Sequence, residues 1–239
     1  MLTLRIDNRF SPDDPHREKK FEDAAALCEF LRLHPVMEGN DRYILTGLDL
    51  SGQSLKGAYL QNVLMFECNL QNVDLSGADL RNAGVIQTDF SGANMTNTVL
   101  IQTNLTAAKL RGTDLTGSVM AATVGSDADF TGAKLVDCKI GSSGFDRGIW
   151  DGADLTGVEF GNGVRFDHAS MQNTNFTGAS AKARIGGLDV DFSGAKVPAN
   201  IRAMLDGPMR AAPNMDAASL RRQKNRNRNR GLKHHGFKT

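Results

Sequence analysis

Large apolar side chains recur at every fifth residue through the middle of the chain. The series runs from Leu45 to Phe160 and is interrupted only by Gly125. A period of five fits neither an α-helix, with 3.6 residues per turn, nor a flat strand, in which side chains alternate. The pattern therefore predicts a repeat architecture in which every unit of five residues has the same conformation.

Two further positions of each unit are restricted in residue type. Two residues before the large apolar position the side chain is mostly small, as at Ala58 and Ala78. Two residues after it Gly or Asn recurs, as at Gly57 and Asn62, and these types tolerate turns and left-handed backbone. We therefore expect the large and the small side chains to point inward and the chain to turn a corner every five residues.

Units such as Ala78-Asp79-Leu80-Arg81-Asn82 and Ala153-Asp154-Leu155-Thr156-Gly157 resemble the A(D/N)LXX motif of pentapeptide-repeat proteins. The resemblance covers residues 43–180, with a last unit at Ala195. It implies an all-β solenoid, a right-handed quadrilateral β-helix in which four pentapeptides make one square coil. Successive coils would then lie about 4.8 Å apart, as strands do in a sheet.

The ends of the chain depart from the repeat and predict three regions: an N-terminal strand and capping helix over 1–40, the β-helix over 41–197, and short helices with a basic tail over 198–239. Residues 1–6 alternate like a strand. A helix is expected from 11–15 to about Leu33, with an apolar stripe that covers the open first coil. That stripe is Phe21, Ala24, Cys28 and Leu31.

The repeat is also interrupted near its C-terminal end. Phe166, Met171 and Phe176 resume one residue late, which indicates an insertion near 161–163, and a second break lies in 182–191. Such breaks are bulges or a small protruding loop. Beyond Pro198, Asn200 is expected to cap a short helix that runs to Leu205.

The net charge of +1 hides an uneven distribution. Residues 201–239 hold ten Lys/Arg and two Asp/Glu, residues 41–200 hold twelve against seventeen, and residues 1–40 hold six against eight. The repeat region is therefore mildly acidic and the tail strongly basic.

Motifs of enzymes, cofactor sites and metal sites are absent from the sequence. The tail pair His234-His235 lacks a further fixed ligand, and the many aspartates occupy the ordinary Asp/Asn position of the repeat. Cys68 and Cys138 occupy inward small positions about 17 Å apart, beyond disulfide reach. We therefore expect no catalytic, cofactor or metal site, and a soluble cytoplasmic protein without a membrane segment.

The expected function is a rigid scaffold that binds a protein partner. Two neighbouring sides of the coil carry apolar residues at outward positions, and a patch of this kind marks an interaction or self-association surface, a homodimer included. Packing under the N-terminal segment is the alternative explanation. The predicted interaction residues are Tyr59, Leu64, Phe66, Ile86, Val99, Ile101, Val119 and Val124.

The resemblance also implies an alternative function, because rods of the quinolone-resistance branch resemble B-DNA in size and charge and bind DNA gyrase. Such mimicry requires a strongly negative surface. Aspartates should follow two sides of this rod at 40-residue spacing: Asp49, Asp89 and Asp129 on one, Asp74, Asp114 and Asp154 on the next. Lys109, Arg111 and Lys134 interrupt them.

The basic tail suggests binding to an anionic polymer, RNA or DNA, or to an acidic protein partner. A solubilising terminus is the simpler alternative. Cations alternate with Asn and lack neighbouring aromatic residues, which favours contact with phosphates over base recognition. The predicted contact residues are Arg221, Arg222, Lys224, Arg226, Arg228 and Arg230.

Overall fold

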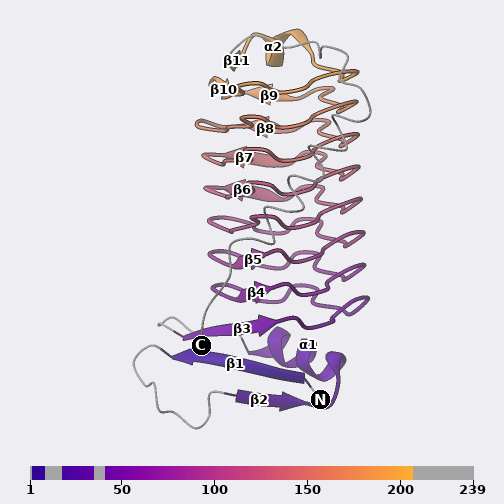
Figure 1. Ribbon diagram of the computed structural model, residues 1–239, viewed down its shortest axis with the longest axis vertical. Helices are drawn as coiled ribbons and strands as arrows, with labels where there is room; N and C mark the ends of the chain where they lie inside the picture. Colours follow the sequence, from indigo (N-terminus) through magenta and orange to yellow (C-terminus); the bar gives the residue numbers. More distant parts are fainter. Residues whose placement is uncertain (1, 9–17, 35–40, 207–239) are drawn as a thin grey trace.

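The computed structural model of the protein is a solenoid of stacked coils with additional elements at both ends (Figure 1). It describes residues 2–8, 18–34 and 41–206. The five-residue period produces this form because one position of each unit pairs in parallel with the residue 20 positions later over most of the repeat, as Asp49 does with Asn69 and Asn69 with Asp89. Four units therefore complete one coil, and the predicted quadrilateral β-helix is confirmed.

Each coil has four faces, which we number from the residue that first points inward on each. Leu45 begins face 1, Leu50 face 2, Leu55 face 3 and Leu60 face 4, and each face repeats every 20 residues. Faces 2 and 3 consist of isolated parallel bridges. Longer strands form only on two adjacent faces: β3 (Asp41–Thr46), β4 (Leu64–Phe66) and β5 (Gly84–Ile86) on face 1, and β6 (Val119–Ala121), β7 (Lys139–Gly141), β8 (Glu159–Phe160) and β9 (Ser180–Ala181) on face 4.

Left-handed backbone at the corners allows the chain to turn every five residues. The predicted corner residues Gly57 and Asn62 have φ values of 65° and 60°. Some corner glycines also face the neighbouring coil closely: at Gly117, with φ of 73°, a Cβ atom would lie 2.5 Å from Oδ1 of Asn97 in the coil before, so the Asn97 side chain would have to move. Ala107 and Ala122 adopt the same conformation with φ of 56° and 53°, so the fold imposes it even on residue types that disfavour it.

The interior of the solenoid is filled with side chains. The inward residues of the five-residue series, from Leu45 to Phe160, are at most 1% exposed where they are hydrophobic. Gly125, the exception in the series, is explained by its neighbour 20 residues later. A Cβ atom at Gly125 would lie 2.5 Å from Cδ1 of Phe145, whose ring fills that space. Phe145 and Phe130 also pack against Trp150, with the Phe130 and Trp150 rings stacked at 4.0 Å.

The N-terminal elements cover the first coil (Figure 1). Strand β1 (Leu2–Asn8) pairs antiparallel with β3 on one side and with β2 (Glu18–Phe21) on the other. Helix α1 (Ala24–Leu33) buries Leu27, Cys28 and Leu31, which belong to the same hydrophobic cluster as the coil interior. The cap predicted from the sequence is therefore present as a strand pair and a helix.

The predicted start of the N-terminal helix is wrong. Residues 18–21 form a strand because they complete the ladder beside β1, and the helix begins only after Asp23, whose side chain accepts a hydrogen bond from Ala26 N at 2.9 Å. Phe21 therefore contributes from a strand and packs on Phe30 with ring centroids 5.2 Å apart. The other predicted helix residues, 11–17, lie outside the described part of the chain.

One inserted residue shifts the pairing near the C-terminal end. The bridge spacing changes from 20 to 21 residues, as in Gly144 with Arg165 and Asp154 with Asn175, so the predicted insertion near 161–163 is confirmed. The ladder continues through 182–191, because Arg165 pairs with Gly186 and Ser170 with Asp191. The second break is thus accommodated within a further coil.

Helix α2 (Ala199–Arg202) and strand β11 (Leu205–Asp206) lie at the C-terminal end of the solenoid (Figure 1). Strand β11 pairs in parallel with β10 (Ile185–Gly186), and Ile201 is buried. The predicted role of Asn200 is wrong: the N-cap position is Pro198, and the Asn200 side-chain amide instead donates to Ala179 O at 2.8 Å. Asn200 thus ties the helix to the preceding coil.

A candidate protein-interaction surface

The two polar faces carry ordered ladders of aspartate and asparagine. On face 2 the bridges place Asp49, Asn69, Asp89, Lys109 and Asp129 in one column, and face 3 has an equivalent column from Ser54 to Lys196. The aspartates and asparagines accept hydrogen bonds from the backbone N–H two residues later, as Asp49 does from Ser51, and asparagine also donates to the aspartate of the coil before, as Asn69 does to Asp49 at 3.0 Å. The predicted alignment of aspartates on two adjacent faces is correct.

Hydrogen bonds hold several of these carboxylates in the charged form. At Asp89, burial alone would raise the pKa, but hydrogen bonds from Ser91 and Gln71 and the charge of Lys109 outweigh it, so the pKa lies below the ordinary value. At Asp191, hydrogen bonds from Ser193 and Gln172 likewise outweigh burial and lower the pKa. These carboxylates therefore accept hydrogen bonds that stabilise the corners of the coil.

Cations pair with two aspartates of the face 2 ladder. Arg111 contacts Asp129 at 2.6 Å and Lys109 contacts Asp89 at 3.3 Å, so two of the cations that interrupt the aspartate column in the sequence form ion pairs within it. Three further ion pairs lie elsewhere on the solenoid. Arg81 pairs with Asp79 in the same coil, and Arg147 with Asp127 and Arg165 with Asp146 connect neighbouring coils. Within the described residues, cations therefore interrupt the acidic column of face 2, whereas Asp74, Asp114 and Asp154 on face 3 form no ion pair.

Apolar outward side chains are concentrated on faces 4 and 1, which meet at one edge. Tyr59 and Val124 are 55% and 46% exposed, and the other predicted interaction residues are half-buried. On face 4, Tyr59, Val99 and Val119 lie in one column, with Ile101 beside it. On face 1, Leu64 and Phe66 belong to β4, Ile86 to β5, and Val124 follows in the Leu64 column three coils later.

The apolar surface differs from the expected continuous patch, because it is staggered. Asp79 lies between Tyr59 and Val99 in the face 4 column and is paired with Arg81. The lower part therefore consists of Tyr59 with the face 1 residues Leu64, Phe66 and Ile86. The upper part consists of face 4 residues Val99, Ile101 and Val119, with Val124 across the edge. The residue pattern places the apolar residues on these two faces. It does not predict the Arg81–Asp79 ion pair between the two parts, because that pair depends on side-chain conformation.

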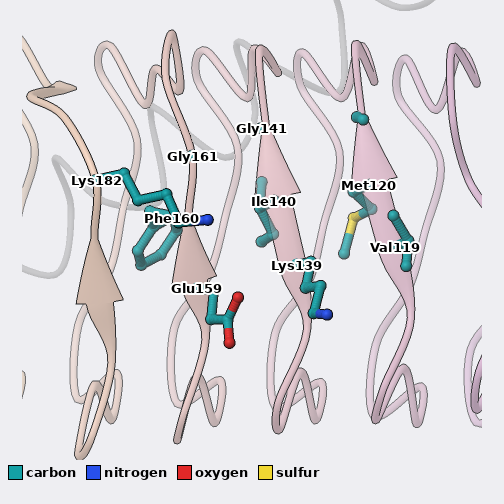
Figure 2. A pocket seen from close by; sticks show the side chains of 10 residues that line it. Val119, Met120, Lys139, Ile140, Gly141, Glu159, Phe160, Gly161 and Lys182 are labelled. Carbon is teal, nitrogen blue, oxygen red and sulfur yellow. The ribbon is translucent and has the colours of Figure 1, made fainter.

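A shallow depression continues the upper part of this surface along face 4 (Figure 2). Val119, Ala121, Gly141 and Gly161 line it, together with Lys139, Glu159 and Lys182 at its margins, and its volume is about 170 Å³. Val119 is one of the interaction residues predicted from the sequence, whereas Gly141 and Gly161 were not predicted. Their signal was present, because Ala121, Gly141 and Gly161 follow one another at 20-residue spacing.

The comparisons with known proteins agree with the repeat architecture. The family model described as pentapeptide repeats (8 copies) matches residues 44–82, 86–121 and 103–140. The matched part of the solenoid, between residues 44 and 140, therefore carries pentapeptide repeats. A comparison with curated proteins gave no significant sequence match.

Solved structures similar to this solenoid include three of different origin. A pentapeptide repeat protein from the Arabidopsis thaliana thylakoid lumen is 26% identical, covering 41% of this chain and 67% of its own, with a TM-score of 0.39. QnrB1, a plasmid-mediated fluoroquinolone resistance protein, is 18% identical over 67% and 82% of the two chains, with a TM-score of 0.43. HetL, involved in heterocyst differentiation regulation in the cyanobacterium Nostoc, is 22% identical over 71% and 90%, with a TM-score of 0.28.

The remaining candidate groups of the protein are structural or lie outside the described residues. Cys28, Cys68 and Cys138 are free and buried, and burial raises the pKa of the Cys138 thiol to about 12. In the described ranges, no group of His, Cys, Asp and Glu has the arrangement of a metal site, and neither helix could cross a bilayer. The predicted tail residues Arg221, Arg222, Lys224, Arg226, Arg228 and Arg230 and the pair His234-His235 lie beyond residue 206 and are not described.

Proposed function

We propose that the protein is a rigid, non-catalytic scaffold that binds a protein partner through the edge shared by faces 4 and 1. The observation that carries this proposal is the unequal distribution of outward side chains. Faces 2 and 3 carry hydrogen-bonded polar ladders, whereas faces 4 and 1 present Tyr59, Phe66, Ile101 and Val124. Apolar side chains gathered on one part of a surface favour burial against another protein.

The construction of the solenoid suits this role. Backbone hydrogen bonds connect every coil to the next, as from Leu70 N to Asp89 O at 2.7 Å, and the interior is packed. Side chains on the outer faces are therefore held at fixed spacing of about 4.8 Å along the rod. The buried, unpaired thiols support a reducing compartment, and we propose the cytoplasm.

The DNA-mimic alternative receives less support. It requires unpaired negative charge along the rod, and the aspartates at 79, 89 and 129 each contact a cation. Exposed ion pairs are weak contributors to stability, but they cancel charge at short range. Gyrase binding therefore remains the second candidate.

The basic tail is proposed to attach the scaffold to an anionic partner, either RNA or DNA. The six cations at 221, 222, 224, 226, 228 and 230 support this assignment by their density and by their alternation with asparagine. Binding is expected to be independent of base sequence.

The test of the scaffold function compares protein capture by three full-length proteins. Phe66→Asp combined with Ile101→Asp places two charges on faces 1 and 4, and the matched control Thr96→Asp with Thr116→Asp places two on face 3. Both pairs change outward, half-buried residues. We expect the wild type and the control to retain the same partner and the face 1/4 variant to lose it, with unchanged circular dichroism in all three.

Two results would count against the scaffold proposal in this experiment. Retention of the partner by the face 1/4 variant would place the interface elsewhere, and loss by both variants would show that added charge acts nonspecifically. Self-association is examined with the same proteins by light scattering, where a homodimer through this surface predicts a halved mass only for the face 1/4 variant.

A further inference from the structure

The depression on face 4 is formed by missing side chains. Three consecutive coils place Ala121, Gly141 and Gly161 at the position just after the inward residue. Elsewhere on face 4 that position holds larger residues, such as Arg81 and Ile101. The result is a hollow of about 170 Å³ whose floor is backbone and the buried residues Met120, Ile140 and Phe160 (Figure 2).

The backbone does not require glycine at Gly141. Neither Gly141 nor Gly161 has a positive φ. A Cβ atom on Gly141 would meet nothing closer than Gly161 Cα at 3.9 Å, which is an ordinary contact. At Gly161 a Cβ atom would lie 3.3 Å from Gly141 Cα, so a side chain there would be crowded. Neither backbone conformation nor crowding at the Cβ position therefore explains the glycine at position 141.

Charged side chains surround the hollow in a fixed order along the rod. Lys139 lies in the same coil as Gly141, Glu159 in the next coil and Lys182 in the one after that; all three line the hollow, and the Lys182 side chain reaches across beside Phe160 (Figure 2). All three are exposed, and none forms an ion pair with another residue of the described chain. Lys139 and Lys182 thus project from backbone positions two coils apart, about 10 Å along the rod, with Glu159 in the coil between them, on a repeat region whose overall charge is negative.

We propose that this hollow receives an apolar side chain of a protein partner, and that carboxylates about three residues apart in the partner contact Lys139 and Lys182. Three residues of extended chain span about 10 Å, which matches the two-coil separation of the lysines. The hollow is close in volume to one aliphatic side chain and supplies the apolar contact, while the lysines select an acidic segment over a basic one. This inference rests on the proposed function, since it states the chemistry of the partner for the upper part of the same surface.

The test uses the full-length protein and a defined probe, the capped peptide Ac-Gly-Asp-Leu-Ala-Asp-Gly-NH2. Binding is followed by the amide NMR signals of Gly141 and Gly161. We expect saturable shifts at these two glycines, at least tenfold weaker binding when both peptide aspartates are replaced by lysine, and similarly weaker binding when the leucine is replaced by serine. Gly141→Leu, which fills the hollow, is expected to abolish the shift at Gly161.

Matched variants separate the hollow from general effects. Thr116→Leu enlarges the equivalent outward position on face 3 and should leave peptide affinity unchanged. Lys139→Glu with Lys182→Glu should reverse the preference toward the lysine peptide. Equal binding of the acidic and basic peptides, no shift up to millimolar peptide, or unchanged affinity in Gly141→Leu would each overturn the inference. Because the capture experiment changes Phe66 and Ile101 only, partner binding there with no peptide binding here would refute this inference and leave the scaffold function standing.

Discussion

Position within the five-residue unit determines what a side chain does in this protein. Thr103 and Thr123 occupy the inward small position and are fully or almost fully buried despite their hydroxyl groups. Each hydroxyl donates to a carbonyl of the coil before: Thr103 to Leu80 O at 2.7 Å and Thr123 to Leu100 O at 2.6 Å. Neither buried hydroxyl therefore lacks a hydrogen-bond partner. The interior therefore tolerates threonine wherever it follows this register.

Contact between coils makes Gly125 sensitive to substitution. Gly125→Ala places a Cβ atom against the Phe145 ring, and we expect destabilisation by about 1–3 kcal/mol from overpacking. Urea unfolding measures the difference. Gly141→Ala, where the added atom meets only an ordinary contact, is the control, and equal stability of the two variants would contradict the packing account.

Acid should destabilise the solenoid through its ladder carboxylates. The folded-state pKa values of Asp89 and Asp191 are lowered, so their stabilising contribution is present above the ordinary aspartate pKa and is lost as the pH falls through the folded-state values. We expect a nearly constant free energy of unfolding between pH 7 and 5 and a decline below about pH 4. Asp89→Asn, with the residue type already present at Asn69 in the same column, should flatten that decline. A pH dependence identical to that of the wild type would argue against this role of Asp89.

At the scale of elements, the repeat was predictable and the cap only partly so. The five-residue period determined the inward series and the corners, because both follow from local sequence. Strand β2 was not predictable from Glu18, Lys19 and Lys20, whose charged side chains carry no strand pattern and which are extended because they pair with β1. Pairing with a strand distant in sequence, and not the local residue pattern, therefore determines the structure of residues 18–21.

The N-cap of α1 gives a direct check on this boundary. Asp23→Ala removes the acceptor for Ala26 N and should cost about 0.5–2 kcal/mol. Hydrogen exchange of the first helical turn should accelerate, whereas Glu22→Ala, one residue outside the cap, should have little effect. If both substitutions behave alike, the helix does not begin at Ala24.

At the scale of the whole molecule, the 20-residue coil sorts side chains into faces of different character. The columns of outward residues on the candidate interaction surface were predictable, because residues 20 positions apart fall in the same column. The small residues that form the hollow around Gly141 can be counted from the sequence in the same way. The staggering of the apolar surface by the Arg81–Asp79 pair and the open space of the hollow depended on side-chain conformations and on contacts between coils. A one-dimensional pattern does not specify these.

The tail prediction also belongs to this scale, since it treats the rod and the tail as separate units. Full-length protein should bind single-stranded RNA or DNA at low salt with little sequence preference, and a truncation ending at Ser219 should lose that binding. Fluorescence anisotropy measures both. Equal affinity of the two proteins, or no binding by the intact one at low salt, would refute a role of residues 221–230.

The most direct test of the scaffold account is site-specific photo-crosslinking in the source cells. A photoreactive amino acid replaces Ile101 on face 4 in one protein and Thr96 on face 3 in another, both at outward, half-buried positions. The account predicts a discrete covalent adduct with a protein partner from position 101 and none from position 96. An adduct from position 96 alone, or the same adducts from both positions, would contradict an interface on faces 4 and 1.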